Sequence, residues 1–572
     1  MINIIYKYKK ILLSIIITLL IFMMLSIENY INPFSVLSLF MFIVCATYIN
    51  KMELYNRNNF KNNVLISSIF SLMYSVGKCC YINRYNNNIN IYRELFSIKS
   101  IMCFLGYLTL LYIILLIVIP WFKSLNIYNK KEVKVNKIII KCSLIIFVCW
   151  IPYLLVYYPG FLSSDSISEI QMIVSGNFSD HHTLIHLLFC LIPYKIGMLL
   201  FNDATVAVSL ITILQMITMS LIFGYVLKFL YDRKINKNIL LIILIYYALL
   251  PVHAFYSITI WKDIIFGGCI LLLTLELVKL FEKRVLTLKN SYSFIIVSIF
   301  TIFFRNNAIY MYVLLSIVTL ILFRKQIKPI LLMLLIVFSF YAIVKGPIYR
   351  LCDIKTSSSS EYIAIPLQQI GRMAYKDVKF TKYEKEMINK LIPISVLKEV
   401  YNPEIVDSIK FNEHFNSIVF EENKFDYFRL WLNLCIKNFD IASEAYLIST
   451  LGYWYPDVNY WSVYSGIDNN DLGIVEKEFL GSKVKKVVSY LTYRSFPLYG
   501  LVWSIGLCIW IIFLSMFIIF QNRNKRALYI YVPVIGVFIS LMVAAPVFAE
   551  FRYLYCAYTT LPILLLSYKM IK

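Results

Sequence analysis

The chain has 572 residues, of which 60% are hydrophobic and only 15% are charged, and its mean hydropathy is +0.72. This composition excludes an ordinary soluble protein, and apolar runs of about 20 residues, enough to cross roughly 30 Å of hydrocarbon, recur along the chain. The net charge of +23 lies mainly in short loops between these runs, which is a positive-inside pattern and excludes a nucleic-acid footprint.

The apolar runs are predicted to be helices, because in lipid every backbone amide must be satisfied within its own segment. We therefore predict an all-α polytopic membrane protein with about 14 transmembrane helices. Lys7, Lys9 and Lys10 precede the first run, and each later basic cluster then falls on the same side of the membrane. The sequence thus predicts a multi-pass protein of the cell membrane with cytoplasmic N- and C-termini.

Four regions follow one another along the chain. Residues 1–122 are predicted to be a four-span extension, and 138–345 a membrane module whose first external loop is 159–183. Residues 346–498 are expected to form a mixed external domain, followed by a three-span segment at 499–572. The apolar stretch 184–201 contains Pro193 and Lys195, so we expect it to lie in the outer interface or to be re-entrant.

The loop between Tyr157 and His186 is the most polar interruption in the membrane module, and it contains no Lys or Arg. Asp165 follows a Pro-Gly turn and a run of serines, so it could cap a helix that begins near Ser166 or act as a general base. The two roles are compatible. Glu169 would lie one turn further along the same helix face.

Three histidines form the other half of this loop. His182 and His186 are four residues apart and could share a metal on one helix face, but the loop offers no HExxH pattern and no clear third ligand. We therefore assign no metal ligand and leave a divalent cation as an open alternative. Hydrogen bonding of His181 and His182 to a polar substrate is the favoured interpretation, and a solvated interfacial loop is the other.

Single cations stand at the outer ends of three later apolar runs: Lys262, Arg305 and Arg552. Each could be a snorkelling interfacial residue, and together they would suit a phosphate. Three neighbouring polar residues are expected on the same external side, and they are Asp263, Asn306 and Glu550.

An aromatic cluster of the external domain includes Trp454 and Tyr455. Its rings could stack on sugar faces or form an interfacial belt, and both readings stay open.

The segments PGFLSSDS, ITIWKD, FRNNAIY and EFRYLY together resemble parts of the GT-C superfamily of membrane glycosyltransferases, such as protein O-mannosyltransferases and aminoarabinose transferases. They are still more similar to a bacterial family of polytopic proteins of unknown function, over roughly 138–570. The pattern departs from many GT-C relatives at Asp165-Ser166 and His182-Thr183, where those proteins have Asp-Glu and His-Pro.

The resemblance implies transfer of a sugar from a polyprenyl-phosphate donor to a glycan, lipid or protein acceptor in the cell envelope, at the external face. It implies that Asp165 is the general base. The sequence lacks GxxxxGK[ST] and GxGxxG motifs, so no nucleotide cofactor is expected. A lipid-linked saccharide flippase, a polymerase or another transporter is the alternative, although most strong charges stand at span ends rather than mid-span.

Overall fold

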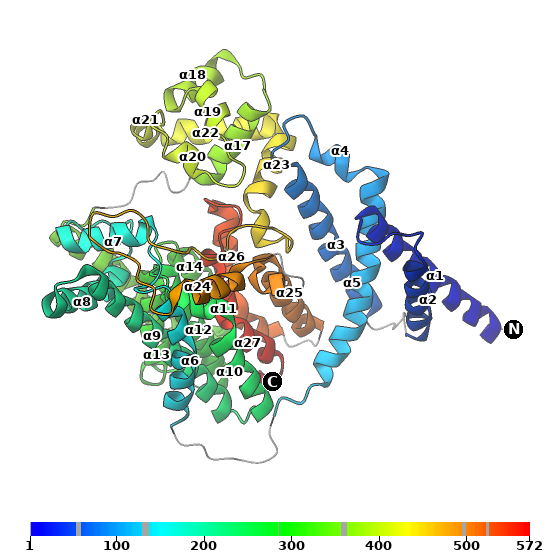
Figure 1. Ribbon diagram of the computed structural model, residues 1–572, viewed down its shortest axis with the longest axis horizontal. Coiled ribbons are helices and arrows are strands. Elements are labelled where there is room, and N and C mark those ends of the chain that lie inside the picture. The colour runs from blue at the N-terminus through cyan, green and yellow to red at the C-terminus, as the bar shows by residue number, and fades with distance from the viewer. Residues whose placement is uncertain are drawn as a thin grey trace. The chain divides into compact units, whose positions relative to one another are not determined.

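The computed structural model of the chain describes residues 2–52, 59–128, 137–283, 285–355, 363–494, 499–521 and 525–571 (Figure 1). Helices account for 77% of the structure, and the described residues contain isolated β-bridges but no strand. The predicted all-α class is therefore confirmed.

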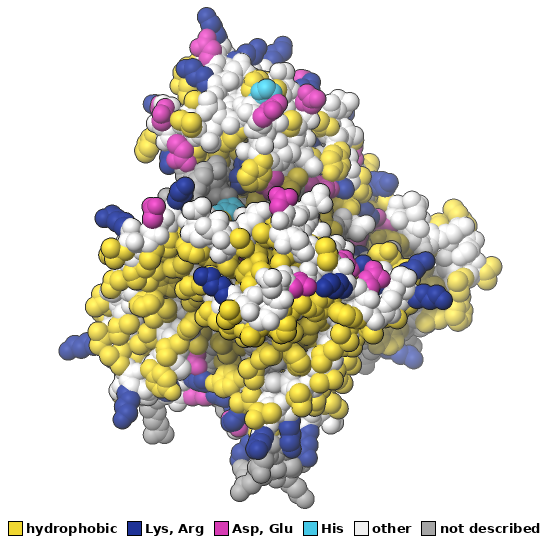
Figure 2. Space-filling model, turned by 60° about the vertical axis from the view of Figure 1, so that its left-hand side comes forward, with side chains coloured by type: hydrophobic (Ala, Val, Ile, Leu, Met, Phe, Trp, Pro, Cys, Tyr) yellow, Lys and Arg dark blue, Asp and Glu magenta, His cyan; other side chains and the backbone are white. Residues whose placement is uncertain are grey.

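Nine described helices are long and apolar enough to cross a membrane. The bent pair Lys237–Leu249 and Pro251–Ser257 would make a tenth, and four further apolar helices of 10–17 residues are shorter. Figure 2 shows a broad surface of hydrophobic side chains with Lys and Arg gathered near its margins, as expected for helices that meet lipid. These features indicate a multi-pass membrane protein, whereas the predicted number of 14 spans stays a prediction.

The stretch predicted to be interfacial forms one helix, α8 (Leu184–Phe201), with Pro193 inside it. It has the length and composition of a membrane span. Its predicted interfacial position therefore stays a prediction.

The described chain divides into two compact units that differ from the predicted regions. The first contains residues 1–125, 362–458 and 545–549, so the N-terminal helices group with much of the predicted external domain. The second contains 126–361, 459–544 and 550–572.

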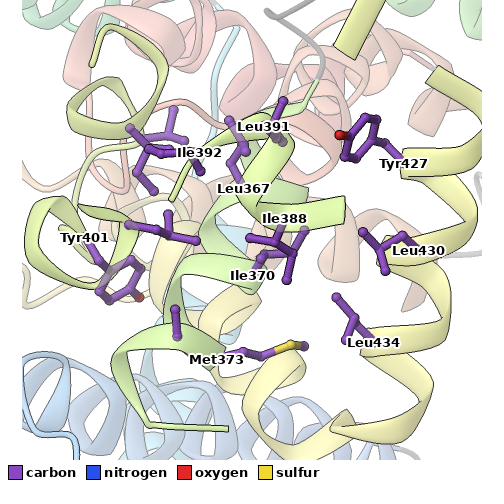
Figure 3. Packing of buried hydrophobic residues seen from close by; sticks show 14 of the residues in the cluster. Leu367, Ile370, Met373, Ile388, Leu391, Ile392, Tyr401, Tyr427, Leu430 and Leu434 are labelled. Carbon is purple, nitrogen blue, oxygen red and sulfur yellow. The ribbon is translucent and has the colours of Figure 1, made fainter. Parts of the chain in front are cut away.

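The first unit begins with the apolar, membrane-type helices α1 (Ile2–Ile27), α2 (Val36–Lys51), α3 (Phe60–Asn83) and α5 (Ile98–Ser124), and the short helix α4 (Ile91–Leu95) lies between the last two. It continues with α17 (Ala364–Tyr375), α18 (Lys382–Leu391), α19 (Ile394–Val400), α20 (Asp407–Lys410), α21 (Ser417–Glu422), α22 (Lys424–Lys437), α23 (Phe439–Ser449) and the 3₁₀ turn η4 (Leu451–Tyr453). Leu367, Ile370, Ile388, Leu430 and Leu434 share one hydrophobic core among the later helices (Figure 3).

A buried ion cluster ties α17 to α23. The guanidinium of Arg372, which is fully buried, donates from Nε to Glu444 Oε1 over 2.9 Å, and Lys376 Nζ lies 2.7 Å from the same carboxylate oxygen. Arg372 NH2 also donates to the carbonyl of Asn86 over 3.2 Å, beyond the end of α3. The cluster therefore joins the membrane-type helices of this unit to its polar helices.

The second unit contains α6 (Ile138–Val156), α7 (Ser164–Ser175), α8, α9 (Ala204–Asp232), α10 (Lys237–Leu249), α11 (Pro251–Ser257), α12 (Lys262–Glu282), α13 (Leu288–Phe304), α14 (Ala308–Leu322), α15 (Ile327–Ile343) and α16 (Tyr349–Leu351). A π-helical turn, η2 (Val344–Ile348), joins α15 to α16. Later elements of this unit include α24 (Gly481–Ser489), α25 (Ile505–Gln521), α26 (Val532–Ala544), η8 (Phe551–Leu554) and α27 (Tyr555–Met570). The central helix α12 packs against α9, α13 and α27 and is largely buried. It therefore provides a fixed support for the residues at its N-terminal end.

We expect Glu444→Ala to destabilise the polar helices of the first unit by about 3–5 kcal/mol, because it leaves the buried Arg372 without its carboxylate. Hydrogen–deuterium exchange of the full chain in detergent should then show lost protection in α17 and α23. The control is Asp377→Asn, which removes the exposed charge that pairs with Lys398 and keeps a residue type that tolerates the φ of +56° at this position, so it should cost less than about 0.5 kcal/mol. Unchanged exchange in Glu444→Ala would mean that this ion cluster does not hold the helices together.

Candidate functional site

The loop after α6 is fixed against the segment that precedes α12. The backbone N–H of Phe161 donates to the carbonyl of Ile258 over 2.9 Å, and the N–H of Ile260 donates back to the carbonyl of Phe161 over 3.2 Å. Gly160 has φ +123°, and a Cβ there would lie 2.5 Å from the Ile258 carbonyl, so this close approach requires glycine. Ser166 Oγ donates to the Ile260 carbonyl over 2.7 Å. The start of α7 is thus held beside the start of α12.

Asp165 stands in the first turn of α7 and pairs with Arg552 of η8. Arg552 NH1 donates to Asp165 Oδ2 over 2.7 Å, and the guanidinium lies 4.7 Å from the centre of the Trp261 ring. Trp261 Nε1 in turn donates to Ser163 Oγ over 2.7 Å. The cap position of α7 is Ser163, so the carboxylate of Asp165 serves an ion pair rather than a capping bond.

Glu169 lies one turn further along α7, as predicted, and faces α8. Its two carboxylate oxygens are 2.8 and 2.9 Å from Nδ1 of His186, and both side chains are buried. His182 is also buried, and its Nε2 has no hydrogen-bond partner among the described residues. This half of the site therefore holds one paired and one unpaired histidine.

A second ion pair fixes the turn that carries the histidines. Lys345 Nζ, in η2, donates to both carboxylate oxygens of Asp180 over 2.7 Å, and Tyr349 OH donates to Oδ1 over 2.8 Å. Asn306 Nδ2 donates to the Asp180 carbonyl over 2.8 Å, and Lys262 Nζ donates to the His181 carbonyl over 3.0 Å.

The remaining charges meet beside Tyr553. Arg305 NH1 lies 3.3 Å from Asp263 Oδ1 and donates to the Tyr553 carbonyl over 3.1 Å. Glu550 Oε1 is buried and lies 3.7 Å from Arg552 Nε. The cations predicted at three span ends thus each face a carboxylate or a backbone carbonyl within the second unit.

These contacts surround a pocket of about 240 Å³, a volume that includes space open to solvent. The lining comes from α7, from the turn that carries His181 and His182 (the histidine turn), from the start of α12 and the residues just before it, and from η8. The lining residues are Asp165, Ser166, Glu169, His182, Ile260, Trp261, Lys262, Asp263 and Arg552. Six of the predicted site residues therefore line one pocket. Four more, namely His181, Arg305, Asn306 and Glu550, contact its lining or the turn that carries His182.

Trp454 and Tyr455 belong to the first unit and do not line this pocket. Tyr455 is buried, its ring lies 5.2 Å from that of Tyr74, and it packs where Gly77 leaves room on α3. Both roles considered for these rings, stacking on sugars and an interfacial belt, stay predictions. Within the second unit, Trp461 is half-exposed and its ring lies 6.5 Å from that of Trp261, which lines the pocket.

Sequence reasoning did not include Lys345 and Tyr349 among the site residues. Lys345 is a lone cation at the end of an apolar run, which is the signal that selected Lys262, Arg305 and Arg552. The sequence gives no comparable signal for Tyr349, because one tyrosine among 45 carries little information.

The pocket shifts the pKa values of its acids in opposite directions. Burial acts to raise the pKa of Asp165, but the charge and hydrogen bond of Arg552 outweigh it and lower that pKa to about 2. Burial raises the pKa of Glu550 to about 7, against the opposing charge of Arg552. Burial also lowers the pKa of His182 to about 4, with a further contribution from Lys262, so this imidazole is neutral near pH 7.

Two groups of side chains bring metal-type donor atoms within 4.8 Å of one another, and they are Asp165 with His181 and His182, and Glu169 with His186 and Cys190. In the first group Arg552 and Lys262 already supply positive charge, which opposes a bound cation. In the second, Glu169 and His186 are joined directly by a hydrogen bond. We therefore assign no metal ligand from either group, and the pocket lining places three carboxylates, Asp165, Glu169 and Asp263, beside its two cations.

Glu550→Gln should change how stability depends on pH. The pKa of Glu550 is raised from 4.5 to about 7, so the folded chain binds its proton more tightly than the unfolded chain does. The stability that this proton supplies is present below pH 4.5 and is lost as the pH rises through about 7. We therefore expect the melting temperature of Glu550→Gln to rise relative to wild type between about pH 5 and about pH 8.

The matched control is Glu413→Gln, because Glu413 is exposed on the first unit and its removal should leave the pH profile of wild type unchanged. If Glu550→Gln and wild type had parallel profiles over this range, Glu550 would not carry a raised pKa.

Comparison with known proteins places the chain in a family. Residues 173–570 match the model described as "Family of unknown function (DUF6020)", a range that includes His182, Lys262, Arg305 and Arg552 and begins within α7, after Asp165. No curated protein and no solved structure matches the chain. The chain therefore belongs to the DUF6020 family.

Proposed function

We propose that this chain is a membrane glycosyltransferase that moves a sugar from a polyprenyl-phosphate donor to a cell-envelope acceptor at the external face. The observation that carries the proposal is the pocket in which Asp165 lies 2.7 Å from Arg552, with Lys262 also in the lining. A carboxylate and two cations in one pocket match the needs of transfer from a phosphate leaving group.

In the proposed reaction, an acceptor hydroxyl attacks the anomeric carbon of the sugar while the bond from that carbon to the phosphate oxygen breaks. Asp165 takes the hydroxyl proton, and the electron pair of the broken bond goes to the phosphate. Arg552 and Lys262 stabilise the charge that develops there, and the planar fork of Arg552 suits two phosphate oxygens.

The ion pair explains how a weak base could become effective. With a pKa of about 2, the carboxylate of Asp165 holds a proton poorly while Arg552 is bound to it. A donor phosphate that binds Arg552 would weaken this pair and raise the pKa of Asp165. Base strength would then increase when the donor is in place.

A lipid-linked donor also agrees with the rest of the chain. The helices with the length and composition of membrane spans would place the chain in the bilayer, where a polyprenyl tail also lies. No nucleotide motif is needed, because the sugar arrives already activated on its phosphate carrier.

Asp165→Asn should reduce sugar transfer by roughly 10²–10⁴-fold, because the amide cannot accept the hydroxyl proton. The acceptor would first be identified by mass spectrometry of envelope glycans and lipids from cells with and without the gene. Transfer would then be measured as polyprenyl phosphate released from a panel of short-chain polyprenyl-phosphate sugars by the purified full chain.

The matched control is Asp203→Asn, because Asp203 caps α9 away from the pocket lining and an asparagine can also cap a helix. It should transfer sugar at the wild-type rate. Full activity in Asp165→Asn, or movement of the lipid-linked sugar across the membrane without release of its carrier, would overturn the proposal.

A further inference from the structure

The helix α24 (Gly481–Ser489) lies against the end of α6 in the second unit. The N–H of Phe479 donates to the carbonyl of Leu155 over 3.1 Å, and the rings of Phe479 and Tyr158 are 5.1 Å apart. Lys485 Nζ is 5.7 Å from the centre of the Tyr157 ring and 2.9 Å from Glu478 Oε1. Because α6 qualifies as a membrane span that ends at Val156, these contacts hold α24 at the level where that span would leave the hydrocarbon.

One side of α24 is apolar and exposed. Leu480, Val484 and Val487 follow helical spacing on this side, and their exposed fractions are 41%, 41% and 65%. Phe479, just before the helix, is also exposed. The described residues thus cover this stripe only in part, and burying the rest would be favourable by the hydrophobic effect.

The span against which α24 packs also exposes apolar side chains, toward its other end. Ile140, Leu144 and Val148 are exposed along α6, as expected for a helix whose outer side contacts acyl chains. Lys483 and Lys486 are exposed next to the apolar stripe, and neither forms an ion pair with a described residue. Apolar side chains beside unpaired lysines are typical of a helix that lies in the membrane interface.

We propose that α24 binds the outer surface of the bilayer, with its apolar stripe among the upper acyl chains and Lys483 and Lys486 on anionic lipid phosphates. This inference does not depend on the proposed glycosyl transfer. It assigns residues 479–487 to lipid contact, whereas the sequence placed them in the external domain. A bilayer surface fits better than a protein partner because the contacts with Leu155 and Tyr158 hold the stripe where a candidate membrane span ends.

The full chain in nanodiscs would test this proposal by hydrogen–deuterium exchange of residues 481–493. We expect exchange to be roughly tenfold slower in an equal mixture of phosphatidylcholine and phosphatidylglycerol than in phosphatidylcholine alone. The double variant Lys483→Glu/Lys486→Glu should lose this lipid-dependent difference. Val487→Glu should lose protection in both lipids, because it places a charge on the apolar stripe.

The control is Lys382→Glu/Lys385→Glu, which makes the same charge change at the same spacing on the exposed face of α18 in the first unit. It should retain the lipid effect on 481–493, and exchange in the buried helix α12 should match wild type in every variant. Equal exchange of 481–493 in both lipids would overturn the proposal. Protection that appeared only with two copies per nanodisc would also overturn it and would identify a second chain as the occupant.

Discussion

The ion pair between Arg552 and Asp165 is the interaction on which the pocket depends. The two residues are 387 positions apart in the sequence, so this ion pair links η8 to the first turn of α7. Arg552 also lies 3.7 Å from the buried carboxylate of Glu550, and its guanidinium faces the ring of Trp261. Removing the guanidinium of Arg552 would leave the carboxylates of Asp165 and Glu550 close together without the cation they share. The cost in folding free energy increases with the burial of these charges. A phosphate entering the pocket would therefore have to share Arg552 with carboxylates that already hold it.

The charged residues of the pocket stand at the ends of packed helices, which hold their side chains in place. Lys262 and Asp263 begin the largely buried helix α12, and Asp165 is in the first turn of α7. Lys345 and Asp180 fix the histidine turn from the other side. Side chains held in this way keep their geometry without help from a ligand, which is what electrostatic stabilisation of a leaving group requires.

The sequence predicted which residues carry charge at the membrane boundary, but it could not predict how they pair. Lone charges beside apolar runs are costly, so Lys262, Arg305 and Arg552 could be selected from the sequence alone. The pairing of Asp180 with Lys345 spans 165 residues and depends on tertiary packing, which has no periodic signal. For the same reason, the grouping of 362–458 with the N-terminal helices could not be foreseen. Tyr455 was selected as an aromatic residue outside the membrane, yet it is buried against α3, because composition does not report burial.

The most direct measurement is a double-mutant cycle on Asp165 and Arg552, read as melting temperature of the full chain in detergent. Asp165→Ala, Arg552→Ala and the double variant would be compared with wild type. If the pair holds the pocket together, the double variant should lose less than the sum of the two single losses, by an amount equivalent to about 0.5–3 kcal/mol. Losses that simply add, within about 0.3 kcal/mol, would show that the two residues do not interact and would contradict the account.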